Sequence, residues 1–167
     1  MPLLEHTVGD PEMTRYLGGA ETPERMRERH ERYLALGDAD LGRMLVILVG
    51  SERAAAGTHG YWRREESGTA VWETGWFVLP AFQGRGIATW ATQLVVAMAW
   101  ADAPERPIHA YPAVDNGASN SVCRKAGFRL IGAFDFEYPP AHILRCNDWV
   151  RDPPASMAGR SGIACAG

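Results

Sequence analysis

The stretch Val78-Leu79-Pro80-Ala81-Phe82-Gln83-Gly84-Arg85-Gly86-Ile87-Ala88 decides the fold, because it joins an apolar, strand-like run to a long uncharged helix. Glycines at positions 84 and 86 let backbone amides converge where that helix begins. The first amides of a helix have no partner inside it, and the helix dipole attracts negative charge there. The stretch therefore predicts an anion-binding turn suited to a phosphorylated cofactor.

Two familiar phosphate motifs do not fit this turn. A dinucleotide-binding fingerprint would need a third glycine at Thr89 and a parallel strand–helix–strand unit, whereas the runs before the turn look like a meander. A P-loop needs Gly-Lys followed by Ser or Thr, which does not occur here. A Gly-x-Gly turn that only joins a strand to a helix is the alternative, so the turn alone does not identify the cofactor.

Composition indicates one ordinary globular domain. The chain has 167 residues, of which 46% are apolar and 22% charged, and a net charge of −3 that does not favour nucleic acid or an anionic membrane as partner. Its three cysteines, Cys123, Cys146 and Cys165, are widely spaced, which argues against a disulfide framework or a zinc site. Since no signal peptide or membrane-spanning run is visible, we expect a cytoplasmic protein.

Periodicity and turn residues predict a mixed α/β (α+β) domain. Helices are expected at residues 11–16, 23–36, 87–101 and 116–126. Strands are expected at residues 43–49, 55–64, 69–78, 107–113, 128–138 and 141–150, the first three forming an antiparallel meander. We expect a single domain over residues 1–151 and a disordered tail over residues 152–167, which are rich in Pro, Gly, Ser and Ala.

Two segments resemble the GNAT superfamily of N-acetyltransferases. The run from Glu73 to Ala88 matches the coenzyme A motif Gln/Arg-x-x-Gly-x-Gly/Ala through Gln83, Gly86 and Ala88. The run Asn116-Gly117-Ala118-Ser119-Asn120-Ser121-Val122-Cys123-Arg124-Lys125-Ala126-Gly127-Phe128 is most similar to the branch that acetylates ribosomal-protein N-termini. The resemblance covers about residues 10–150 and implies a mostly antiparallel sheet, splayed at a cofactor wedge and flanked by helices.

The resemblance also implies acetyl-CoA as co-substrate, no metal, and a bacterial enzyme. Backbone amides would hold the pyrophosphate, with charge added by the arginine, at Gly84, Arg85, Gly86, Ile87, Ala88 and Thr89. Pantetheine would pair, like an added strand, with backbone groups of Trp76, Phe77 and Val78. Asn116 either hydrogen-bonds the pantetheine arm or simply caps the helix that follows it.

For the chemistry, the resemblance implies direct acetyl transfer with the Val78 amide at the oxyanion. Glu73 is our candidate base, acting through water, and the alternative is a cross-strand or surface carboxylate. Strand alternation places Glu73, Gly75 and Phe77 on one face, unless a bulge before Val78 changes which face meets the substrate.

The general acid is less defined, because Cys123 stands where many relatives have a tyrosine. Asn116, Ser119 and Cys123 share a helix face, so Ser119 is the candidate hydrogen bond to the coenzyme sulfur. Cys123 is a candidate acid, and as a nucleophile it would need a lowered pKa that no neighbouring motif indicates. A packed, inert cysteine is the alternative.

The acceptor is a primary amine on a small molecule or a protein N-terminus. Strand alternation puts Phe134, Phe136 and Tyr138 on one face, which with Tyr111 would wall the acceptor pocket, within possible reach of His142. The arginine-rich face over residues 25–32 is expected to be solvated. We predict an acetyl-CoA-dependent N-acetyltransferase, a monomer or homodimer. A non-catalytic acyl-CoA-binding or regulatory domain is the alternative.

Overall fold

The computed structural model describes residues 2–37, 40–138 and 142–155. Its helices are α1 (Pro2–Glu5), α2 (Pro23–Ala35), α3 (Ile87–Asp102) and α4 (Gly117–Lys125), with a 3-10 turn η1 (Pro80–Phe82) before α3. Its strands are β1 (Gly42–Val49), β2 (Ala54–Glu66), β3 (Thr69–Val78), β4 (Ile108–Ala110), β5 (Arg129–Glu137) and β6 (Ile143–Arg151). Most of the predicted tail, residues 156–167, lies outside the described residues.

The strands form one sheet of order β1-β2-β3-β4-β6-β5, in which every neighbouring pair is antiparallel except β3–β4. The parallel pair is joined only at Trp72↔Ile108 and Glu73↔His109. Beyond Glu73 the two strands are no longer paired, and β3 continues to Val78 with a free edge. The expected mixed α/β fold with a splayed sheet is therefore confirmed.

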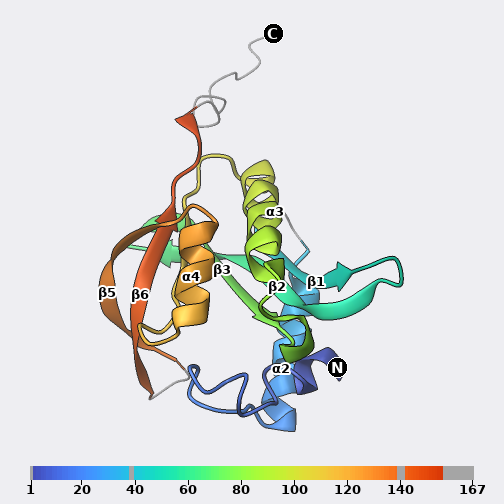
Figure 1. Ribbon diagram of the computed structural model, residues 1–167. Coiled ribbons are helices and arrows are strands. Elements are labelled where there is room, and N and C mark those ends of the chain that lie inside the picture. Colours follow the sequence, from blue (N-terminus) through green and yellow to red (C-terminus); the bar gives the residue numbers. More distant parts are fainter. Residues whose placement is uncertain (1, 38–39, 139–141, 156–167) are drawn as a thin grey trace.

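The two faces of β3 pack against different helices. Trp72 and Trp76 pack with α3 and α4, which lie together on one face of the sheet (Figure 1). Phe77 packs instead against the cluster that α1 and α2 bring to the other face. The β2–β3 register runs without a shift from Glu66↔Thr69 to Gly57↔Val78, so no bulge alters the alternation predicted for Glu73.

Two predicted elements differ from the structure. Residues 11–16 form turns and no helix, because an Asp10 carboxylate caps the amides of Glu12 and Met13 while Gly18 and Gly19 take positive φ values of 83° and 101°. The strand predicted over residues 107–113 ends at Ala110, where the chain loses its place beside β3. Among the described residues, no helix is long and apolar enough to cross a membrane.

Candidate active site

A cavity of about 710 Å³ opens where β3 and β4 diverge. Its walls come from the end of β3, the start of α3, the outer face of α4 and the inner faces of α2 and β5. It brings together most of the residues that the sequence singled out, although these are far apart in the chain.

The turn at residues 83–89, called the glycine turn below, forms one end of the cavity. Gly84 and Gly86 have φ values of 71° and 76°, a conformation that L side chains rarely adopt, and Gly86 is the N-cap of α3. The first helical hydrogen bond runs from the Trp90 amide to the Gly86 carbonyl (3.0 Å), so the amides of the preceding turn have no helical partner. This end of the cavity can bind an anion through backbone groups.

Two side chains of the glycine turn have roles that differ from one another. The Gln83 amide donates to the Val78 carbonyl at 2.8 Å and so ties the turn to the end of β3. Arg85 is exposed and is not among the residues lining the cavity; its guanidinium lies 5.8 Å from the Phe82 ring. The predicted charge near the pyrophosphate thus needs a movement of Arg85 toward the cavity.

The free edge of β3 faces the cavity with its backbone. The Leu79 amide donates to Ala56 of the β2 side, and hydrogen-bonding direction alternates along an antiparallel strand. The N–H and C=O groups of Thr74, Trp76 and Val78 therefore point away from β2 into the wedge, and all three residues line the cavity. An extended ligand could add here as a strand.

The start of α4 forms the facing wall. Asn116 caps this helix, its side-chain oxygen accepting the Ser119 amide at 3.1 Å, and both residues line the cavity. Asn120, which the sequence argument passed over, is buried and accepts from Asn147 (2.7 Å) and Trp149 (2.8 Å) while donating to the Ala113 carbonyl (2.9 Å). These bonds fix the start of α4 against β6. An asparagine inside a helix was the available signal.

Glu73 lies on β3 where its pairing with β4 ends, and its side chain lines the cavity at 15% exposure. Burial raises the pKa of this carboxyl, and the hydrogen bond from Arg64 at 2.8 Å lowers it, leaving the pKa above its usual range. The Trp62 ring lies over Gly75, where a Cβ would meet it at 3.1 Å. A partly desolvated carboxylate of this kind suits general-base catalysis.

The opposite end of the cavity is aromatic, and we call the part lined by Tyr33, Trp62, Tyr111, Phe136 and Tyr138 the aromatic end. Ring centroids are 5.6 Å apart for Tyr111–Phe136 and 6.4 Å for Phe136–Tyr138. Phe134 belongs to the same stack, 5.3 Å from Tyr111, but is not among the lining residues.

The comparisons agree with this geometry. The model of the acetyltransferase (GNAT) domain matches residues 1–129. The chain belongs to the GNAT acetyltransferase family. It is thus an acetyl-CoA-dependent N-acetyltransferase, and no curated protein sequence matches it.

Solved structures share the GNAT fold at low sequence identity. The ribosomal-protein-S5-alanine acetyltransferase from Vibrio fischeri is similar with a TM-score of 0.73 and 15% identity over 92% of this chain and 87% of that one. An acetyltransferase that modifies the N-terminal serine of ribosomal protein L7/L12 from Salmonella typhimurium gives 0.63 and 22% over 83% and 79%. An aminoglycoside acetyltransferase in complex with coenzyme A gives 0.69 and 17% over 96% and 91%.

Cys123 of this acetyltransferase does not lie in the active-site cavity, which corrects the expectation of a catalytic thiol. It is fully buried among core residues, and burial raises its pKa to about 12. The cavity face of α4 is centred on Ala118, Val122 and Lys125, so Ser119 lies at its margin and Cys123 faces inward. The alternative of a packed, inert cysteine fits the structure.

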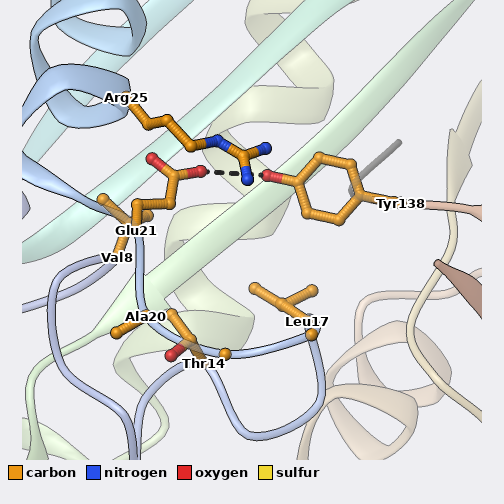
Figure 2. Close-up of a pocket in the computed structure, with 9 residues that line it drawn as sticks. Val8, Thr14, Leu17, Ala20, Glu21, Arg25 and Tyr138 are labelled. Carbon is orange, nitrogen blue, oxygen red and sulfur yellow. Dashed lines mark hydrogen bonds between the residues drawn. The ribbon is translucent and has the colours of Figure 1, made fainter. Parts of the chain in front are cut away.

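Arg29 was expected to face water, yet it lines the cavity with a side chain only 12% exposed. Its guanidinium binds both oxygens of Glu21 and donates to the hydroxyls of Tyr33 (2.8 Å) and Tyr138. Figure 2 shows the Glu21 carboxylate turned toward the Tyr138 hydroxyl, above a small pocket of about 40 Å³. His142, by contrast, is exposed and does not line the cavity.

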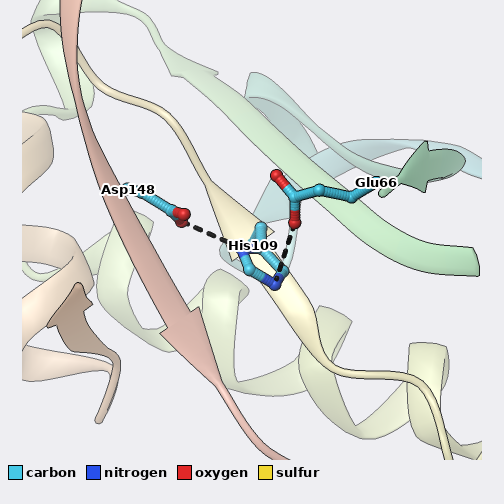
Figure 3. A group of neighbouring side chains, drawn as sticks. All are labelled: Glu66, His109 and Asp148. Atoms are coloured by element: carbon cyan, nitrogen blue, oxygen red, sulfur yellow. Dashed lines mark hydrogen bonds and ion pairs between the residues drawn. The ribbon is translucent and has the colours of Figure 1, made fainter. Parts of the chain in front are cut away.

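A histidine between two carboxylates stands behind the aromatic end (Figure 3). His109 Nδ1 is 2.8 Å from Asp148, and Nε2 is 3.6 Å from Glu66, which also accepts from the Tyr111 hydroxyl at 3.1 Å. The three acidic and imidazole groups have metal-ligand chemistry and close spacing. Because both ring nitrogens already face carboxylates, we interpret the cluster as a hydrogen-bonded support for Tyr111.

Proposed function

We propose that Glu73 is the general base for acetyl transfer to a primary amine. The observation that carries this proposal is the position of Glu73, which lines the cavity at the point where the sheet splays and has a pKa raised by burial. The carboxylate, directly or through a water, takes a proton from the amine, whose nitrogen then attacks the thioester carbonyl. Arg64 holds the carboxylate in place.

The free edge of β3 and the glycine turn support the proposed position of acetyl-CoA. Pantetheine would pair with the backbone at Trp76, Phe77 and Val78, and the pyrophosphate would lie on the amides of residues 84–89. The Val78 amide would stabilise the carbonyl oxygen as it becomes negative. The carbon–sulfur bond then breaks, and the departing thiolate accepts a hydrogen bond or proton from Ser119 or solvent.

The acceptor would be a small amine or a protein N-terminus, as the names of the similar structures include both kinds of substrate. We infer a cytoplasmic location, which the free, buried Cys123 and Cys146 support.

Two measurements test the function together. Coenzyme A at a hundred times its dissociation constant should stabilise the protein by about 2.7 kcal/mol in thermal unfolding. Acetyl-CoA with a panel of primary amines should release free thiol and form an amide detectable by mass spectrometry. Stabilisation by coenzyme A without turnover of any amine would instead indicate the non-catalytic acyl-CoA-binding alternative.

A further inference from the structure

We propose that the acceptor is a small primary amine carried on an uncharged aromatic group, and that the aromatic end selects it against polycations. This inference rests on the proposed function of the same cavity. It is argued from the walls of the aromatic end and from the pairing of its charges.

The base and the aromatic rings are adjacent. Arg64, which binds Glu73, lies with its guanidinium carbon 5.0 Å from the ring centroids of both Tyr111 and Phe136. The stack continues to Tyr138, and Tyr33 and Trp62 also line this end of the cavity. An amine that reaches Glu73 therefore has its body among aromatic rings, which bind a flat apolar group by stacking and edge contacts.

The charges of this end are already paired. Glu73 is bound by Arg64, and Glu21 is bound by Arg29. The other carboxylate that lines the cavity within the described part of the chain is Glu12, whose side chain is 86% exposed at the rim beside Arg15. A polycation would need further carboxylates for its other ammonium groups, because a buried charge without a partner is strongly unfavourable.

Arg15, Arg29 and Lys125 also line the cavity, so its cationic side chains outnumber its two carboxylates. The resulting potential disfavours spermidine and aminoglycosides at the cavity mouth. A single ammonium group loses its charge on giving a proton to Glu73, which leaves a neutral amine beside the rings. The aromatic monoamine thus satisfies both the charge and the shape of this end.

The experiment compares kcat/KM for five acceptors with the full chain and saturating acetyl-CoA: 2-phenylethylamine, hexylamine, spermidine, kanamycin and a short peptide with an N-terminal alanine. We expect 2-phenylethylamine to exceed each of the others by about tenfold or more, the advantage of aromatic stacking and of a single charge. A higher value for spermidine, kanamycin or the peptide would overturn the inference and leave the proposed function standing. Equal values for hexylamine and 2-phenylethylamine would overturn the aromatic selection.

A pair of matched variants locates the effect. F136L should raise KM for 2-phenylethylamine by about tenfold, while F134L, which changes a ring of the same stack outside the cavity lining, should change KM by less than about threefold. The dissociation constant of coenzyme A should stay the same in both, showing that the fold is intact. Equal KM changes in the two variants would contradict recognition at Phe136. If no acceptor gave turnover although coenzyme A bound, the proposed function itself would fail.

Discussion

At the glycine turn, backbone groups of one short segment form the wall of the cavity, whereas at the aromatic end the wall is made of side chains from α2, β2, β3 and β5 and from Tyr111 beyond β4. Arg29 and Tyr138, which bond directly there, are 109 residues apart. Backbone amides bind a phosphate whatever the neighbouring side chains are, so a glycine pattern can identify that end. Side chains brought together by folding can differ without changing the fold.

The largest expected effect comes from E73Q at the boundary between the two ends. Loss of the general base should lower kcat by about 10²–10⁴-fold. In the wild type, kcat/KM should rise with pH as Glu73 loses its proton, and this rise should lie above the usual carboxyl range because burial raises the pKa. Steady-state thiol release measured against pH checks both. A variant with nearly full activity and an unchanged pH profile would exclude Glu73 as the base.

G86A should separate the glycine turn from the rest of the chain. Gly86 has φ 76°, and an added methyl group would strain the backbone and stand beside amides proposed to bind phosphate. We expect coenzyme A affinity to fall by about tenfold or more, along with about 1–2 kcal/mol of stability. Thermal shift titration measures both.

G68A is the matched control for this change. Gly68 has φ 79° and open space around its Cβ position, but it lies in the β2–β3 hairpin. It should cost a similar amount of stability and leave coenzyme A affinity unchanged. Equal losses of affinity in G68A and G86A would mean that the glycine turn does not hold the coenzyme.

Y138F should weaken the aromatic end alone. The change removes a hydroxyl that accepts a hydrogen bond from Arg29, and bonds to charged groups contribute about 1.5–3 kcal/mol. We expect a severalfold higher acceptor KM with unchanged coenzyme A affinity. Y16F, which changes another tyrosine lining the cavity without breaking a bond to Arg29, is the control. A loss of coenzyme affinity in Y138F would show that the two ends are coupled.

C123A should have the smallest effect on activity. Because Cys123 is buried in the core, we expect kcat and both KM values to change by less than about twofold, with stability lower by about 1–2 kcal/mol. Native protein should also resist alkylation at this thiol, whose pKa is raised to about 12. A large fall in kcat at unchanged stability would restore a catalytic role.

Local signals predicted the elements well where chain neighbours determine the structure. Thr22 caps α2 as expected from the Thr-Pro-Glu sequence, and β3 has its predicted bounds. The same periodicity failed for Cys123, because helical spacing says which residues share a face but not which way that face turns. Arg29 was misjudged for a related reason: its burial depends on Glu21 and Tyr138, and on Tyr33 one turn along α2.

By itself, the sequence determined the family, the order of elements and the glycine turn, because these depend on residues close together in the chain and on backbone groups common to all proteins. Only the tertiary structure decided that Glu73 is a buried carboxylate held by Arg64, that Cys123 belongs to the core, and that Arg29 faces the aromatic end. Those properties arise from desolvation and from ion pairs between distant segments. Neither exists until the sheet has assembled and splayed.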